Sequence, residues 1–599
     1  MVRWLDPHQL LDTAVRVLIS GIFSSYADNR ELQALEPAEV PDRCARSDLW
    51  LDYVADLGDG WNSTYTIARL LATEELKVEW DGEARTTERG RILVMGGDAV
   101  YPVPKAAEYE NRMLGPYRSA LPCARGDAPE LFAIPGSHDW YDGLVNFTSI
   151  FCRDRSIGGW KTGQHRSYFA LKLPNHWWLW GIDIQFGAYI DQAQLRYFTE
   201  VAVYHMEPGD QIILCMAKEV ESGRKAADIH SDRDVEYLER EIIQPTGARV
   251  ALYLKSGKHH YARYESEDGA RQHIASGGGG AFLHPTHDLP ETMSHRGAEG
   301  AVTYHKTVTY PSPKKSKGLR KYIWLLPPYN LPLASVLGTV QLLLVFMMGL
   351  QLKERYLNLG LGDLPRAVWE SPTAFLLIIA MILFLAAMVR FAHDARGIRR
   401  FMLGLVHSTL QLGSVAGVLI LSSTIASGSG LGSGWSLVVF LSLVAVLGGI
   451  GGILAMSAYL WATNCLGFHA NEGYAPLHYQ HFKHFLRLHI EADGTLTVYP
   501  IGVDKVGRKW RLDPNAPAYA PWFAPEGAEP ESHLIEKPIT VPGPRSTEPQ
   551  ATAVAGAGAG ATADTASTGG EAGAPTESPT IRLPTAGPPP NSPPITKPS

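Results

Sequence analysis

The chain has 599 residues, of which 45% are hydrophobic and 19% are charged, and its formal net charge is −7. This length allows two or three domains, and the acidic balance argues against a nucleic-acid-binding surface. The five cysteines show no Cys-x-x-Cys pair and no disulfide-framework spacing, which predicts reduced thiols in a cytosolic compartment.

The first half of the chain predicts a short helical segment followed by an α/β domain. Within residues 1–44, the apolar run 10–22 is interrupted by Asp12 and Arg16, which predicts an amphipathic helix and no cleavable signal. From 45 to 310, strand-like apolar runs alternate with helix-like or turn-rich stretches. That alternation is typical of a layered α/β domain.

Residues 322–468 predict four transmembrane helices. The apolar stretches span about 333–350, 373–389, 402–425 and 435–460, near the 20 or so residues that cross a bilayer core of about 30 Å. None carries a charge at its centre, and Gln341, Gln411 and the glycines of 448–452 predict close helix packing. Four buried helices of a large soluble core remain the alternative.

The basic residues in the short connections predict the orientation of these spans. They gather before the first stretch and in the second connection, whereas the third connection carries no charge. By the positive-inside rule, a multi-pass protein with four spans has both ends in the cytoplasm. The α/β domain and the C-terminal segment are then expected on the cytoplasmic side.

The C-terminal part predicts a hairpin and a disordered tail. In the segment 469–525, alternating runs at 485–490 and 496–499 flank an Asp493-Gly494 turn, which is typical of a β-hairpin. A lone hairpin is unstable in water, so it should dock on the catalytic domain. Residues 526–599 are rich in Pro, Ala, Gly and Thr and predict disorder.

Three short polar strings, each directly after a strand-like run, are the most informative feature of the sequence. They are Asp56-Leu-Gly58, Gly97-Asp98-Ala-Val-Tyr101 and Gly136-Ser137-His138-Asp139, after runs at 51–55, 92–95 and 131–134. Side chains in such positions meet at the carboxyl edge of a sheet. Carboxylates, a phenol and an imidazole suit a hard metal cation and a phosphate ester.

The order and spacing of these strings resemble the calcineurin-like metallophosphoesterase superfamily, in particular its purple acid phosphatase branch and, by the Gly-rich loop 277–280, a membrane-attached branch. The resemblance covers about 48–290 and implies a layered β-sandwich flanked by helices. It also implies a first metal, Fe, Mn or Zn, with Asp56, Asp98 and Tyr101 as ligands. Aligning 256–259 on the family's Gly-His-x-His motif adds His259 as the fourth ligand.

The same resemblance implies that the second metal site has lost ligands, which leaves one metal per chain. Ser137 stands where the family has Asn, Gly257 replaces the first His of Gly-His-x-His, and Ala217-Lys218-Glu219 stands where a further His is expected. A charged lysine cannot ligate a metal. The hypothesis is that the Lys218 ammonium replaces part of the missing charge.

By the same resemblance, His138 contacts the phosphate and protonates the leaving group, and Asp139 orients it. Contacts to phosphate are also expected from a set of polar residues near the motifs: Ser137, His260, His284 and His287. The plainer alternatives are a packed loop aromatic for Tyr101 and a surface turn with solvent-exposed histidines for the Gly-rich loop.

These observations favour an enzyme, an integral-membrane metal-dependent phosphoesterase whose partners are the lipid bilayer and a phosphate-ester substrate. The alternative is a catalytically degenerate pseudo-phosphatase that acts as a membrane-tethered phosphate- or ligand-binding regulatory module. A transporter is disfavoured because the spans carry no buried charge. The sequence predicts no nucleic-acid partner and does not indicate a protein partner.

Overall fold

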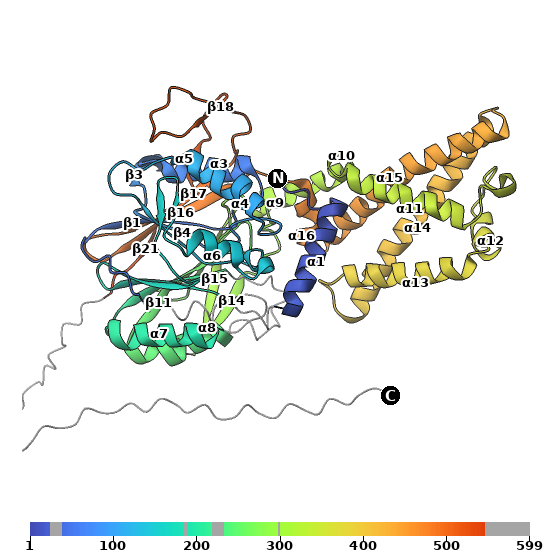
Figure 1. Ribbon diagram of the computed structural model, residues 1–599. Coiled ribbons are helices and arrows are strands. Elements are labelled where there is room, and N and C mark those ends of the chain that lie inside the picture. The colour runs from blue at the N-terminus through green and yellow to red at the C-terminus, as the bar shows by residue number, and fades with distance from the viewer. Residues whose placement is uncertain (24–38, 185–189, 218–232, 298–299, 545–599) are drawn as a thin grey trace, which may run out of the picture. The chain divides into compact units, whose positions relative to one another are not determined.

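Two mixed β-sheets packed face to face, with helices on their outer faces, form the main body of the computed structural model (Figure 1). The structure describes residues 1–23, 39–184, 190–217, 233–297 and 300–544. The predicted fold class, an α/β sandwich followed by long apolar helices and a hairpin, is confirmed.

The nine-stranded sheet has the order β20-β17-β16-β1-β4-β5-β7-β6, and β21 also pairs with β17. The bounds are β20 Ser532–Leu534, β17 Leu496–Val503, β16 Lys483–Ile490, β1 Leu49–Val54, β4 Ile92–Met95, β5 Glu130–Ala133, β7 Trp160–Thr162, β6 Ser156–Ile157 and β21 Ile539–Val541.

The eight-stranded sheet has the order β14-β15-β12-β13-β11-β10-β9-β8. Its strands are β14 Thr292–Gly297, β15 Gly300–Tyr310, β12 Tyr261–Ser266, β13 Gln272–Ser276, β11 Arg249–Lys255, β10 Gln211–Met216, β9 Trp177–Ile182 and β8 Phe169–Leu173. Two small hairpins complete the strands, β2 Glu75–Trp80 with β3 Glu83–Glu88 and β18 Trp510–Leu512 with β19 Phe523–Pro525.

Parallel pairing brings the motif loops to one edge. β1 pairs in parallel with β4, and β4 with β5, so that Val54 lies opposite Met95 and Met95 opposite Ala133. In the other sheet β10 and β11 are parallel, with Met216 opposite Lys255. Because parallel strands end at the same edge, the loops that follow them converge.

The hairpin of β16 and β17 is an integral part of the nine-stranded sheet. β16 pairs antiparallel with β1, with Leu51 opposite Leu488. The short strands β20 and β21 pair with β17. The predicted start of the disordered tail at 526 is therefore too early. Residues after 526 form β20 and β21, and Ile539 and Val541 pack into the core. Residues 545–599 lie outside the described part of the chain.

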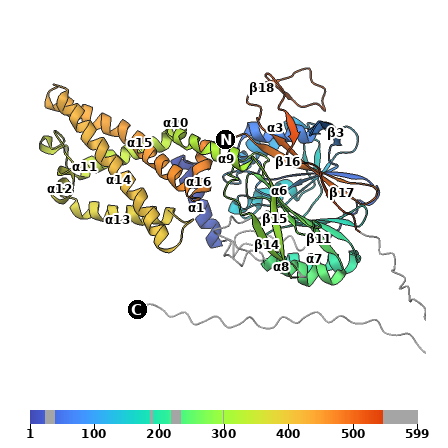
Figure 2. The same ribbon diagram turned by 180° about the vertical axis from the view of Figure 1, so that it is seen from behind.

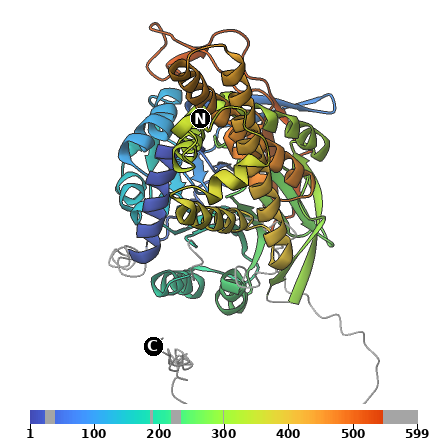
Figure 3. The same ribbon diagram turned by 90° about the vertical axis from the view of Figure 1, so that its right-hand side faces the viewer.

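Apolar residues of both sheets share the central core, and helices cover the two outer faces. Helices α3 (Trp61–Ala72), α5 (Gly115–Ala120) and α6 (Val145–Phe151) pack on the nine-stranded sheet. Helices α7 (Gln192–His205) and α8 (Arg233–Leu238) pack on the eight-stranded sheet and are seen end-on in Figure 3. The helix α4 (Ala106–Tyr109) precedes α5, and α1 (Pro7–Phe23) forms the predicted N-terminal helix.

Long apolar helices follow β15, after the short helices α9 (Pro313–Leu319) and α10 (Leu326–Tyr329) (Figure 2). Three are long and apolar enough to cross a membrane, α13 (Ala374–Phe391), α14 (Gly397–Gly428) and α15 (Ser433–Cys465). The helix α11 (Leu331–Met347) makes a fourth if it counts together with the segment before it, from which it bends by 63°. The short helices α12 (Asp363–Trp369) and α16 (Ala470–Tyr474) lie outside these candidates.

Glutamine side chains bond helix to helix at glycine carbonyls, as the sequence predicted. Gln341 Nε2 of α11 donates to the Gly448 carbonyl of α15 at 3.1 Å. Gln411 Nε2 of α14 donates to the Gly452 carbonyl at 3.0 Å. In the absence of side chains at these glycines, the backbones approach closely and expose their carbonyls to the amides.

Candidate metal centre

The four residues predicted to hold the first metal meet around one oxygen atom. The Tyr101 hydroxyl oxygen lies 3.2 Å from Asp56 Oδ1, 3.2 Å from Asp98 Oδ2 and 3.0 Å from His259 Nε2. The residues come from the loops after β1, β4 and β11, and all four are buried. Parallel pairing aligns the loops within each sheet, and the face-to-face packing of the two sheets brings His259 to Tyr101, 158 positions away in the sequence.

Backbone hydrogen bonds and a glycine hold these loops in place. The Asp56 amide donates to the Gly97 carbonyl at 3.0 Å, and the Leu57 amide donates to the Asp98 carbonyl at 2.9 Å. Both aspartates have positive φ angles, 56° and 47°, a conformation that Asp tolerates better than most residues. A Cβ at Gly277 would lie 1.9 Å from Asp56 Oδ2, so only glycine lets the Gly-rich loop 277–280 come this close to Asp56.

The His259 ring presents the nitrogen that a metal needs. Its Nδ1 lies 2.9 Å from the Phe282 carbonyl, which can only accept, so Nδ1 carries the proton. The lone pair of Nε2 then faces Tyr101, as in metal-ligating histidines. Burial lowers the pKa of His259 well below its usual range and keeps the ring neutral.

The donor atoms gathered here are of the types that bind metal ions. Two carboxylates, a phenol and a neutral imidazole converge, and the single hydroxyl proton of Tyr101 can go to only one of its three neighbours. Burial and the two carboxylates raise the pKa of Tyr101 well above its usual range. Asp56, Asp98, Tyr101 and His259 would hold a hard or borderline cation such as Fe, Mn or Zn.

At the predicted second metal site, a backbone amide lies where a ligand was expected. Gly257, which replaces the family's first histidine, donates its N–H to both Asp56 carboxylate oxygens at 3.2 and 3.0 Å. Ser137 is half-buried on the neighbouring loop. Lys218, the predicted substitute for the second cation, lies outside the described residues.

His138 is fixed next to the centre. Its amide donates to Asp98 Oδ1 at 2.8 Å, and its ring Nδ1 lies 2.8 Å from the Pro102 carbonyl. Nδ1 therefore carries the ring proton, and Nε2 is the atom that can take up or give a proton. Burial lowers the pKa of His138.

The prediction that Asp139 orients His138 is wrong, because the Pro102 carbonyl does so. The Asp139 carboxylate instead accepts from the Tyr109 hydroxyl at 2.6 Å and from the backbone amides of Ala99 and Gly136 at 3.1 and 2.9 Å. It thus joins two motif loops and helix α4. Burial and the nearby Asp98 charge raise the pKa of Asp139 to about 7.

Of the three other predicted histidines, one stacks on a residue of the centre. The His284 ring stacks on His259, with centroids 4.0 Å apart. His260 is buried, and burial lowers its pKa to about 3. His287 points elsewhere, because its ring nitrogens contact Ser316 Oγ at 2.7 Å and Arg320 Nε at 3.0 Å. The rings of His284 and His287 are buried, so the solvent-exposed turn considered as an alternative is also wrong.

Lys483 is a buried lysine that interacts electrostatically with Asp56 of the centre, and its sequence position did not predict this. It lies on β16, and its Nζ has no hydrogen-bond partner among the described residues. Burial lowers the pKa of Lys483 to about 7, although the negative charges of Asp59 and Asp56 act in the opposite direction. A lysine at the start of an apolar, alternating strand was the available signal, but its burial depends on the pairing of β16 with β1.

The N-terminal residues also contact the centre. The Trp4 ring packs edge-on against Tyr101 and His138, with centroids 5.9 Å away in each case. The Val2 amide donates to Asp59 Oδ1 at 3.0 Å. Trp4 therefore covers one side of the candidate centre, which its sequence position did not indicate.

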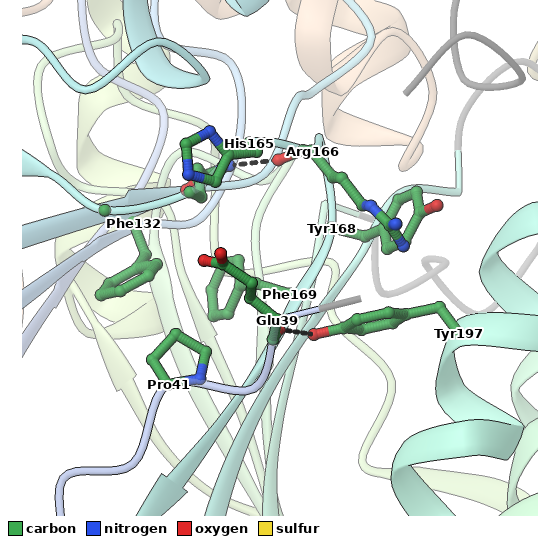
Figure 4. Close-up of a pocket in the computed structure, with 10 residues that line it drawn as sticks. Glu39, Pro41, Phe132, His165, Arg166, Tyr168, Phe169 and Tyr197 are labelled. Carbon is green, nitrogen blue, oxygen red and sulfur yellow. Dashed lines mark hydrogen bonds between the residues drawn. The ribbon is translucent and has the colours of Figure 1, made fainter. Parts of the chain in front are cut away.

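A small cavity of about 30 Å³ lies apart from the predicted site residues, none of which lines it (Figure 4). Tyr197 and Glu39 close one side of it, where the Tyr197 hydroxyl donates to the Glu39 carbonyl at 3.2 Å. It is smaller than the pockets of small-molecule sites, which hold roughly 300–1,000 Å³.

Comparisons with known proteins give similarity at the level of solved structures. No protein-family profile and no curated protein matches the sequence. Similar structures include GAP50, the anchor in the inner membrane complex of Plasmodium, with 13% identity and a TM-score of 0.29 over 43% of this chain and 84% of that one.

Two other similar structures are a purple acid phosphatase from yellow lupin seeds and PhoD. The phosphatase has 11% identity and a TM-score of 0.29 over 46% of this chain and 51% of its own. PhoD has 9% identity and a TM-score of 0.26 over 42% of this chain and 60% of its own. The chain thus spans about half the length of the lupin phosphatase that it matches.

Proposed function

We propose that the chain is a membrane-embedded, metal-dependent phosphoesterase with one metal ion per chain. The observation that carries this proposal is the convergence of Asp56, Asp98 and His259 on the Tyr101 hydroxyl within 3.2 Å. A cation bound by this set would lower the pKa of a water molecule and polarise a phosphoryl oxygen. The substrate class is a phosphate ester.

The chain's own residues divide the remaining work. His138 holds its ring through Nδ1 and the Pro102 carbonyl, so that Nε2 can move a proton to or from a leaving group. Gly257 donates its N–H to Asp56, and the buried Lys483 amine interacts electrostatically with Asp59 and Asp56. They supply positive potential where two-metal enzymes hold their second cation, a role that the sequence analysis gave to Lys218.

The arrangement in the membrane follows from the path of the chain. β15 precedes the long helices and β16 follows them, and both belong to the same sandwich. The chain must therefore leave and re-enter on one side of the bilayer, which requires an even number of crossings. Four spans satisfy this if α11 and the bent segment before it form one span. By the positive-inside rule, the basic residues in the connections support a cytoplasmic position for the sandwich.

The second candidate is a phosphate-binding regulatory module without turnover. Trp4 favours it, because its ring packs against His138 and Tyr101 where a substrate would approach. Under this alternative the centre still binds a ligand, but Nε2 of His138 delivers no proton.

The test is metal content and hydrolysis by the full chain in detergent, with aryl phosphate monoesters and diesters as substrates. Asp98→Asn and His259→Ala should each lose the metal and lower hydrolysis more than about 100-fold. Replacing a residue that only hydrogen-bonds to a metal ligand typically costs about 10- to 100-fold. Asp81→Asn is the matched control, because Asp81 is an exposed turn residue with a similar positive φ. Bound phosphate without turnover would favour the regulatory module, and a metal-free wild type would overturn the proposal.

A further inference from the structure

A second group of metal-ligating side chains lies at the ends of the long helices. His393 and Asp394 belong to the loop between α13 and α14, and Glu472 lies on α16. His393 Nε2 is 3.4 Å from Asp394 Oδ1 and 3.2 Å from Glu472 Oε1. One ligand atom from each residue lies within 4.8 Å of the other two.

The hydrogen bond that His393 makes through Nδ1 leaves its Nε2 facing the two carboxylates. Its Nδ1 lies 3.0 Å from the Phe391 carbonyl, which can only accept, so the proton is on Nδ1. In the neutral ring the Nε2 lone pair then faces two carboxylate oxygens. Three acceptors at this distance repel one another unless a positive charge lies between them.

The buried ring of His469 is an independent sign of a ligand. Its side chain has no exposed surface, and Nδ1 has no hydrogen-bond partner in the described part of the chain. This atom lies 3.8 Å from Glu472 Oε2, a buried oxygen that also lacks a hydrogen-bond donor among the described residues. Two buried polar atoms of this kind, each without a partner, are costly to maintain.

Neighbouring contacts hold His469 and Asp394 in position. The Tyr459 hydroxyl lies 2.9 Å from His469 Nε2, which fixes the ring. The His469 amide donates to Asp394 Oδ2 at 2.9 Å, and the residue adopts a φ of 53° to do so. The other carboxylate oxygen of Asp394, Oδ1, lies 3.4 Å from His393 Nε2.

We propose that His393, Asp394, Glu472 and His469 form a site for a divalent cation, with Zn²⁺ as the best match. Ligand atoms of His393, Asp394 and Glu472 lie within 4.8 Å of one another, and His469 Nδ1, 3.8 Å from Glu472 Oε2, would complete a four-coordinate set of the kind that zinc accepts. The half-exposed ring of His393 provides a route of entry. The cation would tie the α13–α14 loop to the segment after α15, so the site is separate from the proposed phosphoesterase centre.

The test must separate the two centres. The full chain carrying Asp56→Asn and Asp98→Asn lacks two ligands of the first centre, so zinc bound by this background reports the second one. We expect one Zn²⁺ per chain after dialysis and a melting temperature that rises on adding Zn²⁺. Failure of the phosphoesterase proposal would not affect this result, because no activity is measured.

Adding His393→Ala and Glu472→Gln to the background should abolish both the bound zinc and the rise in melting temperature. The matched control is His305→Ala with Glu267→Gln, an exposed pair whose atoms lie 3.6 Å apart, and it should change neither. His393 is exposed enough for its replacement to leave folding intact. Zinc binding that is unaffected by the first pair, or a melting temperature that does not respond to Zn²⁺, would overturn the proposal.

Discussion

The ion pair between Arg487 of β16 and Asp52 of β1 should be a main determinant of the stability of the sandwich. Arg487 Nε and Nη2 lie 2.7 and 3.2 Å from the two Asp52 oxygens, and the side chains are 0% and 3% exposed. Arg487→Ala leaves the Asp52 charge buried with only the Gly90 amide as a described donor. Removing one partner of a buried pair costs about 3–5 kcal/mol, a large part of the roughly 5–15 kcal/mol that stabilises a domain.

Labelling of Cys215 measures this loss in the full chain. This thiol is buried on β10 in the core and is reached by a reagent only when the sandwich opens. Since about 1.4 kcal/mol corresponds to a factor of ten, Arg487→Ala should speed labelling by about 100-fold to several thousand-fold. The double change Asp52→Leu with Arg487→Met should stay near wild type, since an apolar pair replaces the charges. An increase of less than tenfold for Arg487→Ala would refute the reasoning.

Three further changes test other parts of the structure. Gly277→Ala would place a Cβ 1.9 Å from Asp56 Oδ2, so metal content and hydrolysis should fall at least about tenfold; wild-type values would contradict the site geometry. Burial holds the pKa of His273 well below its usual range, so the folded chain keeps it neutral while the unfolded chain protonates it below about pH 6.5. Stability is therefore unaffected by the titration of His273 above that pH and falls as the pH drops below it. His273→Phe should flatten the drop in melting temperature between pH 7.5 and 5; an unchanged drop would count against this. Trp4→Ala should raise kcat/KM for a bulky diester relative to a small monoester, because the ring covers His138; an unchanged ratio would show that Trp4 does not limit access.

The sequence could predict the parts of the site that follow parallel strands. Asp56, Asp98 and His259 each follow an apolar run; parallel pairing of β1 with β4 brings the first two together, and the packing of the second sheet adds His259. Asp139 shows the limit of that reasoning, because its place next to His138 did not determine which partner its carboxylate would meet.

Contacts over long sequence distances could not be predicted. Lys483 reaches the centre only because β16 adds to the edge of β1, a pairing of residues more than 400 positions apart. The position of Trp4 next to the centre likewise depends on a distant contact, the hydrogen bond from the Val2 amide to Asp59. The start of the predicted disordered tail was also misplaced, since the composition around 532–541 does not reveal the pairing of these residues with β17.

The position of β16 after the long helices has a consequence for biosynthesis. β1 and β16 are bonded through residues 435 positions apart, and a ribosome adds roughly 5–20 residues per second. β1 is therefore translated about 20–90 seconds before its partner, and all the long helices emerge in between. Throughout that interval its edge presents unpaired N–H and C=O groups, which are prone to pairing with other chains. The newly made α/β part thus needs protection until the hairpin of β16 and β17 has been translated.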